Sequence, residues 1–330
     1  MAAVQFTVPL SIGFLELIFS ENVTDKTETL YIDEYTTRES LKDEITAKCN
    51  ENTAIFIDLL YKLTGKEPGK HPGCYRITPD MNVYELFRLI SGRDGKTVDF
   101  TFNNIRTKDE FAGTVSKYLS LPADTVRGMM NDSTLCHKFG FDTETITAMF
   151  LPDTYELYRN YAPHAFMHKM KREYDRFWNE GRRKLAADAG LSPIEVSVLA
   201  SIVEEETKVQ PEMNRVAGLY INRLRKGLPL QADPTVKFAA GDFTLRRILK
   251  KHLESESPYN TYKYKGLPPG PIRIPSKVAI DAVLNYEKNN YIYMCAKEDL
   301  SGTHNFTASY AEHQRNAAKY RKALNKLNIK

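Results

Sequence analysis

Three consecutive glutamates, Glu204 to Glu206, end a run of apolar residues and are followed by a threonine in this chain of 330 residues. A carboxyl group in apolar surroundings is pushed towards its protonated form. A protonated carboxyl group can act as a general acid near neutral pH. Which of the three glutamates can do this depends on which side chain turns towards the apolar side of its helix.

The register of this helix follows from its first residues. The sequence SPIE, residues 192–195, has the order of a capping box with proline in the first helical position. With about 100° of rotation per residue, Glu206 falls in the middle of an apolar stripe. On the same wheel Glu204 lies on the solvent side and Glu205 on the flank, so the pattern selects Glu206 as the acid.

The place of Glu206 in the last turn adds a second effect. The negative end of the helix dipole also favours the protonated form of a carboxyl group. The alternative is that the helix frays after Val203 and that Glu206 pairs with Lys208 or Arg215 in solvent, because most glutamates at helix ends are surface residues.

The elements before this helix predict a small mixed module. Strands are expected in TLYI and GCYRI, with two helices between them in TRESLKDEITAKC and NTAIFIDLLYKLT. A helix in NVYELFRLIS and a strand in KTVDFTFN follow. The order strand, helix, helix, strand is that of small glycan-binding LysM modules.

The rest of the chain is predicted to be mostly helical. A long amphipathic helix is expected to end at Gly190, and a second helix, PEMNRVAGLYINRLRKG, at Gly227. Asp233 is expected to cap a third helix. The prolines of SPYNTYKYKGLPPGPIRIPSKVAI predict an ordered loop, after which we expect a strand at residues 291–295 and a basic helix at residues 309–326.

Composition and motifs exclude several functions. The net charge of +4, from 46 basic and 42 acidic residues, is far from that of a dedicated nucleic-acid binder. The sequence has no CxxC pair and no GxSxG, P-loop or GxGxxG motif. His164 and His168 have a metal-binding spacing but lack the glutamate of HExxH. We therefore expect neither a metal nor a cofactor.

The N-terminal segment fits no standard targeting pattern. VPLSIGFLELIF, residues 8–19, is apolar, but it is short, carries Glu16 and has no Lys or Arg before it. A secretory signal needs a basic start, and a transmembrane span needs about 20 apolar residues. Residues 1–24 are therefore expected to be an apolar segment, either the remnant of a membrane anchor or an ordinary strand.

Several motifs together resemble one known family. The stretch LASIVEEETKVQPEMNRVAGLYINRLRKGLPLQADPTV resembles the core signature of the endolytic murein transglycosylases, the YceG-like family, which reads as an ASIVEKET run, a VFINRL helix and an LQTDPTV turn. FLPDTYELY precedes it, and YNTYKYKGLPPGPI and GTHNFTASYAEHQ follow it in the order of the family. The resemblance covers essentially Thr27 to Asn328. The departures are Glu205, where Lys is common, and Ala232, where Thr is usual.

The resemblance implies an activity and a fold. It implies endolytic cleavage of peptidoglycan strands between N-acetylmuramic acid (MurNAc) and N-acetylglucosamine (GlcNAc), which leaves a 1,6-anhydroMurNAc end. The catalytic glutamate of the family, directly before Thr, maps to Glu206, the residue that the wheel also selects. The implied fold class is α+β: a LysM-like module at residues 25–95 is followed by a helix-rich catalytic domain of the lytic-transglycosylase type at residues 96–330.

The family also implies a location and partners. Its members are usually held to the cytoplasmic membrane by one N-terminal helix, so the expected location is the periplasmic face of that membrane in the bacterial cell envelope. The expected partners are peptidoglycan glycan strands, cell-wall synthesis proteins and, through an anchor, the inner membrane. No nucleic acid is expected.

The remaining motifs supply polar side chains of the type that hold an acetamidosugar. Asp233 fits a helix cap equally well, and Asn222 and Arg223 fit a helix surface. The candidate substrate-binding residues are Asn222, Arg223, Gln231, Asp233, Asn260, Tyr262, His304 and Asn305.

Two other functions agree with the residues alone. A muramidase-type hydrolase would use Asp233 or another carboxylate to direct water onto the sugar. A glycan-binding module would position or terminate new strands with little turnover. The place of Glu206 in an apolar stripe argues against the binding module.

Overall fold

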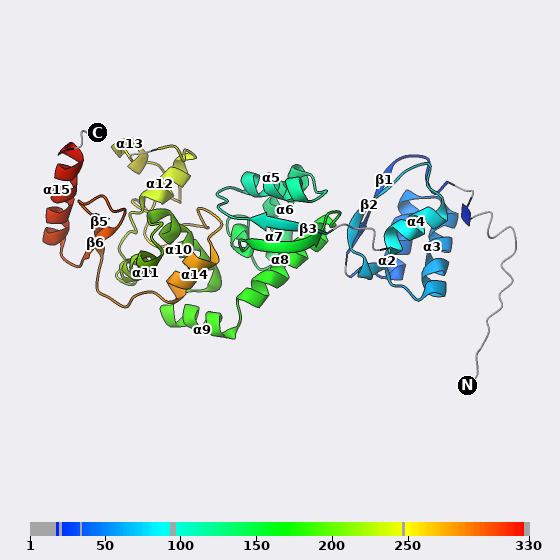
Figure 1. Cartoon of the computed structure of the whole chain (residues 1–330), viewed down its shortest axis with the longest axis horizontal. Helices are drawn as coiled ribbons and strands as arrows, with labels where there is room; N and C mark the ends of the chain where they lie inside the picture. The colour runs from blue at the N-terminus through cyan, green and yellow to red at the C-terminus, as the bar shows by residue number, and fades with distance from the viewer. Residues whose placement is uncertain (1–17, 20–21, 34, 93–96, 246–247, 327–330) are drawn as a thin grey trace. The chain divides into compact units, whose positions relative to one another are not determined.

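The computed structural model describes residues 18–19, 22–33, 35–92, 97–245 and 248–326 (Figure 1). The α+β class expected from the sequence is confirmed, because helices alternate with small two-stranded sheets. Contacts divide the chain into two compact units. The first unit contains Met1–Phe100, Thr114–Val126 and Tyr155–Lys169, and the second contains Thr101–Gly113, Arg127–Thr154 and Met170–Lys330.

The first unit begins with the predicted order of strand, helix, helix and strand. The antiparallel strands β1 and β2 pair with Leu30 opposite Tyr75. Helix α2 begins with a capping box between Thr37 and Ser40, and α3 ends at Gly65, whose φ of 65° is a left-handed conformation that favours glycine. The elements are β1 (Glu28–Ile32), α2 (Arg38–Lys48), α3 (Glu51–Thr64), a 3-10 turn η1 (Pro68–Lys70), β2 (Gly73–Ile77) and α4 (Val83–Ser91).

These elements enclose a hydrophobic core of their own. Leu30, Ile45, Ile57 and Ile77 are almost completely buried in it. Ile18, from the end of the apolar N-terminal segment, belongs to the same core, while the rest of that segment up to residue 17 lies outside the described residues.

A group of short elements follows, several of which run from one unit into the other. Strands β3 and β4 pair with each other in a second sheet. The elements are β3 (Thr97–Phe102), α5 (Lys108–Tyr118), α6 (Ala123–Asn131), α7 (Ser133–Lys138), a 3-10 turn η2 (Ile146–Met149), β4 (Asp153–Tyr158) and α8 (Pro163–Phe177).

The expectation of one long helix ending at Gly190 is wrong. Helix α8 ends at Phe177, and α9 (Glu180–Ala189) begins afresh because the Asn179 side chain accepts a hydrogen bond from the backbone N–H of Arg182. Asparagine at this position is a strong helix start. The predicted end of α9 at Gly190 is confirmed by a left-handed φ of 80° at that glycine.

The central helix of the second unit is α10 (Pro193–Glu206), which packs against α9, α11, α12 and α14. Its capping box at Ser192 is confirmed. Every residue from Val196 to Val203 is buried, so the helix has no solvent side. The remaining helices are α11 (Gln210–Arg225), α12 (Asp233–Ala240), α13 (Lys250–Leu253) and α14 (Lys277–Leu284).

The proline-rich segment differs in part from its prediction. Residues 257–276 form no helix or strand, but α14 begins at Lys277, because the Ser276 hydroxyl oxygen accepts a hydrogen bond from Ala279 N. The C-terminal strand β5 (Tyr293–Ala296) and helix α15 (Tyr310–Lys326) are confirmed. The strand β6 (His304–Thr307), which pairs antiparallel with β5, was not predicted.

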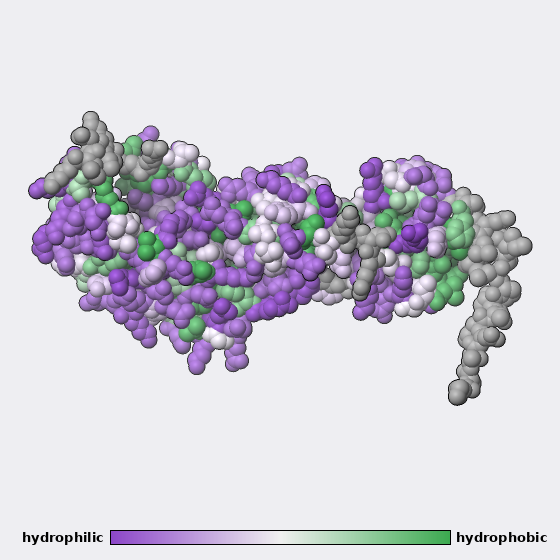
Figure 2. Space-filling view, in the orientation of Figure 1, coloured by the Kyte–Doolittle hydropathy of each residue, from purple (hydrophilic) through white to green (hydrophobic). Residues whose placement is uncertain are grey.

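Polar and charged side chains predominate on the face shown in Figure 2. Among the described helices, no single one is both long and apolar enough to cross a membrane. The bent pair α9 and α10, at 73° to each other, meets the criteria of length and composition only when taken together.

Candidate active site

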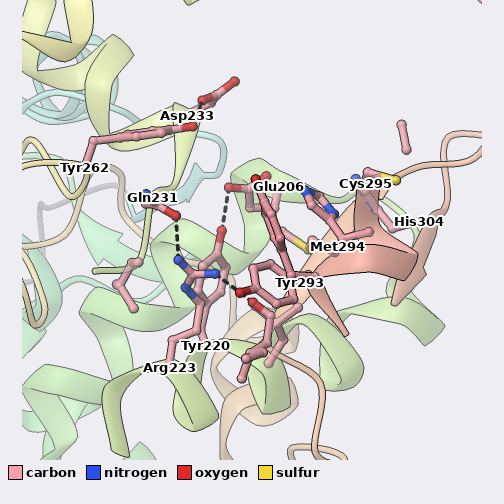
Figure 3. A pocket seen from close by; sticks show the side chains of 16 residues that line it. Glu206, Tyr220, Arg223, Gln231, Asp233, Tyr262, Tyr293, Met294, Cys295 and His304 are labelled. Atoms are coloured by element: carbon pink, nitrogen blue, oxygen red, sulfur yellow. Dashed lines mark hydrogen bonds between the residues drawn. The ribbon is translucent and has the colours of Figure 1, made fainter. Parts of the chain in front are cut away.

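A pocket of about 520 Å³ in the second unit contains Glu206 (Figure 3). We call it the acid pocket and define it by its walls: Glu206 at the end of α10, residues of α11 and α12 with the turn between them, and residues of β5, β6 and α15. In the view of Figure 3, Glu206 lies between Asp233 and Tyr262 on one side and Cys295 and His304 on the other.

Glu206 is the last residue of α10 and keeps part of its surface open to the pocket. The Tyr220 hydroxyl of α11 donates a hydrogen bond of 2.6 Å to Oε1 of Glu206. Burial raises the pKa of Glu206 from 4.5 to about 7; the Tyr220 hydrogen bond opposes this rise, and the negative charge of Asp233 adds to it. Glu206 therefore holds a proton over much of the range up to neutral pH.

The alternative in which this helix frays is wrong. Helix α10 continues through Glu206, and Thr207 closes it with a backbone hydrogen bond to Val203. The carboxyl group of Glu206 is bound to Tyr220 rather than to Lys208 or Arg215 in solvent.

The two neighbouring glutamates have a different role. Arg273, whose side chain is only 3% exposed, lies 2.5 Å from Oε1 of Glu205 and 3.5 Å from Oε2 of Glu204. Glu204 also accepts a hydrogen bond of 2.9 Å from Ser276 N, so its predicted place on the solvent side is wrong. The reason is that α14 and the segment before it cover this side of α10.

Nearby charges make the pKa shift of Glu205 opposite to that of Glu206. Burial alone would raise the pKa of Glu205, but the charges of Lys208, Arg273 and Arg106 together outweigh burial and lower it. Two adjacent glutamates thus have opposite pKa shifts, one towards the carboxylate and one towards the acid. Such a divergence is typical of a site in which one carboxyl group donates a proton.

Five of the eight candidate substrate-binding residues line the acid pocket: Arg223, Gln231, Asp233, Tyr262 and His304. The guanidinium of Arg223 is buried and donates to Gln231 Oε1 at 2.6 Å, to Ile292 O at 2.6 Å and to Pro229 O at 2.9 Å. Gln231 has a φ of 53°, a strained conformation for a residue with a side chain. Arg223 therefore ties the turn before α12 to the segment that leads into β5.

Asp233 is not the cap of α12, as the sequence suggested. The cap position is Ala232, and Asp233 is the first helical residue. The Asp233 carboxylate is exposed and accepts a hydrogen bond of 2.6 Å from the Tyr262 hydroxyl instead. Both side chains therefore present polar groups to the pocket.

The other three candidates are described by the structure but lie outside the lining of the pocket. Asn222 Nδ2 donates to Asn289 O at 2.9 Å and to Tyr291 O at 3.0 Å. Asn260 is fully buried and donates to the backbone oxygens of Leu253, at the end of α13, and of Ser255. Asn305 Nδ2 donates to Glu298. In this structure their amide groups hold chain segments in place.

The sequence did not single out several residues of the site. No local sequence pattern marks Tyr220, because its hydroxyl bond to Glu206 joins two different helices. Tyr293 and His313 also line the pocket, with ring centroids 5.2 Å apart and nearly parallel planes. Glu212 is only 7% exposed and contacts His304.

Comparisons with known proteins agree with the resemblance seen in the motifs. The YceG-like family model matches residues 30–319. An endolytic murein transglycosylase of Bacillus subtilis (strain 168) is 43% identical over 122 residues, 37% of this chain and 33% of that protein. One of Streptococcus pneumoniae serotype 2 (strain D39 / NCTC 7466) is 32% identical over 130 residues, 38% of this chain and 23% of that protein. These matches thus span a third or less of the relatives' own length.

The fold has a counterpart among solved structures. A crystal structure of a yceG-like protein from Listeria monocytogenes matches with a TM-score of 0.56 and 23% identity, over 88% of this chain and 99% of that chain. The family model covers most of the chain, including all the motifs that build the acid pocket. The protein therefore belongs to the YceG-like family.

Proposed function

We propose that the protein is a peptidoglycan lytic transglycosylase, which cuts the MurNAc–GlcNAc bond within nascent glycan strands and leaves a 1,6-anhydroMurNAc end. The observation that carries the proposal is Glu206: it lines a pocket, is hydrogen-bonded by Tyr220, and has a pKa raised to about 7 by burial. The names of the curated relatives support the choice of substrate.

The reaction needs one carboxyl group that acts first as a general acid and then as a general base. Glu206 donates its proton to the glycosidic oxygen as the bond to C1 of MurNAc breaks, and the 2-acetamido oxygen of MurNAc bonds to C1. The C6 hydroxyl oxygen of the same sugar then attacks C1 and displaces the acetamido oxygen. The Glu206 carboxylate takes the hydroxyl proton, so the acid is restored and no water is consumed.

The other residues of the pocket bind and orient the strand in this proposal. Asp233 and Tyr262 form one hydrogen-bonded pair in the lining of the pocket, and Arg223 holds Gln231 in place. Asn222, Asn260 and Asn305, the candidates outside the lining, act through the segments that they hold. We retain these eight residues as substrate-binding or substrate-positioning residues.

A location and partners follow from this activity. A peptidoglycan enzyme works in the bacterial cell envelope, and we place this one at the periplasmic face of the cytoplasmic membrane, near the cell-wall synthesis proteins. In this proposal the module of β1, α2, α3 and β2 is LysM-like and contacts glycan, and an N-terminal anchor attaches the native protein to the membrane. The order of its four elements supports the module assignment.

A hydrolase is the second candidate function. The exposed Asp233 carboxylate lies in the same pocket as Glu206, which is what a muramidase-type hydrolase would need to direct water onto the sugar. A glycan-binding module with little turnover is the third. The transglycosylase and the hydrolase leave different ends on the product strands, and the binding module leaves the strands uncut.

Mass spectrometry of the soluble products distinguishes these three functions. Uncrosslinked strands are incubated with the wild-type protein, with Glu206→Gln, and with Glu254→Gln, the same change at an exposed glutamate. We expect products lighter by one water than reducing sugars from the wild type and Glu254→Gln, and none from Glu206→Gln. Reducing ends would favour the hydrolase, and strands bound but uncut by the wild type would favour the binding module.

A further inference from the structure

The buried carboxylate of Glu212 joins three parts of the acid pocket. Glu212 lies at the start of α11 and is 7% exposed. Its Oε2 accepts hydrogen bonds from Thr207 Oγ1 at 3.0 Å and from His304 Nδ1 at 2.9 Å. Its Oε1 accepts the backbone N–H of His304 at 2.7 Å. Glu212 thus connects the residue directly after Glu206 with the strand β6.

These bonds determine which nitrogen of His304 carries the proton. A carboxylate only accepts hydrogen bonds, so Nδ1 must be the protonated nitrogen of the ring. In the neutral ring Nε2 then has a lone pair and no proton. His304 lines the acid pocket, and its side chain is 16% exposed, so this lone pair is available to a bound sugar.

Other charged or titratable groups line the same pocket, whereas Glu212 lies behind His304, outside the lining. They are Glu206 of α10, Tyr220 and Arg223 of α11, Asp233 of α12, Tyr262, Tyr293 and Cys295 of β5, and Tyr310 and His313 of α15. Arg223 already donates to three acceptors, and Asp233 already accepts a hydrogen bond from Tyr262. His304 differs from them because a buried anion fixes its tautomer and leaves a bare acceptor towards the pocket.

We propose that His304 Nε2 accepts the hydrogen bond of the 2-acetamido N–H of the MurNAc unit to be cleaved, and that Glu212 is the positioning residue that holds His304 in this tautomer. The inference rests on the proposed function and specifies how the substrate's acetamido group is recognised. This contact makes the protein selective for an N-acetylated sugar at the position that reacts.

The chemistry of the reaction favours this contact. When the acetamido oxygen bonds to C1, positive charge spreads over the amide, and its N–H becomes a stronger donor. An acceptor that is already in place stabilises this state more than the resting substrate, which lowers the barrier. The proton stays on the amide nitrogen, so no transfer is required, and Glu206 remains the only group that exchanges a proton.

A matched pair of variants tests the role of His304. His304→Asn places an amide near the position of Nδ1, so it can still donate to Glu212 but offers nothing at Nε2. His304→Gln reaches the position of Nε2 with an amide oxygen that accepts and does not titrate. We expect His304→Asn to lower kcat/KM by roughly 10- to 100-fold, the loss of one such hydrogen bond, and His304→Gln to retain most of it. His137→Asn, at an exposed histidine of α7, is the control.

Discrimination between two substrates provides the readout that a purely structural role would not change. A strand whose muramic acid carries a 2-O-acetyl ester keeps the carbonyl oxygen of the 2-acetamido group but has no N–H. We expect the ratio of kcat/KM between the amide strand and the ester strand to be at least roughly tenfold larger in the wild type and in His304→Gln than in His304→Asn. Glu212→Gln no longer fixes the tautomer of His304 and should lose part of this discrimination. An equal ratio in all four proteins would overturn the proposal.

Binding of a transition-state mimic tests the acetamido assignment separately. In the 1,2-thiazoline derivative of MurNAc, sulfur on C1 closes the ring and nitrogen remains in the place of the amide nitrogen. Binding is measured for the protonated thiazolinium form, because only that form has an N–H that can donate to His304 Nε2. We expect its affinity to fall at least tenfold in His304→Asn but little in His304→Gln. Equal affinity in all three proteins would mean that His304 makes no hydrogen bond to the acetamido nitrogen and would refute the assignment. If the wild type binds the thiazoline through His304 but cuts no strand, the proposed function fails and the contact stands.

Discussion

Burial keeps Glu206 protonated for catalysis, but it lowers the stability of the folded protein at high pH. Burial raises its pKa from 4.5 to about 7, so the folded protein binds this proton more tightly than the unfolded chain does. Protonated Glu206 makes its full contribution to the free energy of unfolding below pH 4.5, and this contribution is lost as the pH rises towards 7. Above pH 7 the folded protein contains a poorly solvated carboxylate.

The first prediction concerns stability. Glu206→Gln should match the wild type in free energy of unfolding near pH 4 and exceed it by about 3 kcal/mol at pH 8, because the pKa shift corresponds to about 1.4 kcal/mol per unit. Denaturant unfolding at the two pH values measures the difference. A gain of equal size at both pH values would show that ionisation of Glu206 is not its source.

The second prediction concerns Tyr220. Its hydrogen bond lowers the pKa of Glu206 against the effect of burial, so Tyr220→Phe should raise that pKa further. We expect the alkaline limb of the pH profile to move to higher pH in this variant. Tyr174→Phe, at a buried tyrosine of α8, serves as the control and should leave the limb in place. A shift to lower pH in Tyr220→Phe would contradict the assignment.

At the scale of elements, the end of α10 is held by buried charges. Arg273 faces Glu204 and Glu205 and is almost inaccessible to solvent. Arg273→Met would leave two carboxylates in a half-buried site without this cation, and we expect a loss of about 3–5 kcal/mol of stability. Arg106→Met removes a partner that is 35% exposed and should cost about 1 kcal/mol or less. Thermal unfolding compares the two, and similar losses would contradict the argument.

The packing of α11 depends on one glycine. A Cβ atom at Gly218 would lie 2.2 Å from the carbonyl oxygen of Glu287 and 3.0 Å from Asn289 Nδ2. Gly218→Ala should therefore displace the segment that leads into β5, with a loss of about 1–3 kcal/mol and of activity. Gly128→Ala in α6 meets no atom within 4 Å and should be neutral or slightly stabilising. Unfolding curves and strand-cleavage rates measure both, and an active, stable Gly218→Ala would disprove the close contact.

Much of this arrangement can be predicted from the sequence where local chemistry decides. The capping boxes at Thr37 and Ser192 and the glycine ends at Gly65 and Gly190 mark helix boundaries without reference to the rest of the molecule. Asn179 carries the same kind of signal, but its place inside a continuous amphipathic pattern concealed the break between α8 and α9.

The site is less predictable because partners that are distant in the sequence determine it. Helix α10 is buried on all sides, so a helical wheel cannot by itself distinguish Glu204 from Glu206; Arg273 and Tyr220 do so. Asp233 is a good cap by residue type, but the Tyr262 hydroxyl provides another partner for its carboxylate. Strand β6 is only four residues long and is defined by its pairing with β5.

At the scale of the whole molecule, the module from β1 to α4 should unfold separately from the rest of the chain. The core around Ile57 belongs to this module, and Gly218 lies in α11 of the second unit. A module with its own core need not share one cooperative transition with the other parts of a chain. In calorimetry of the full chain we expect two transitions, of which Ile57→Ala lowers only one and Gly218→Ala only the other. One transition that moves with both variants would contradict this division.

The order of the pocket walls along the chain has a further consequence. Glu206 comes from the middle of the sequence, whereas the wall formed by β5, β6 and α15 comes from its C-terminal part. During translation the helix that carries the acid leaves the ribosome well before this wall does. A nascent chain therefore has its proton donor before it has an enclosed binding site, because the site also needs residues up to His313 to be synthesised and folded.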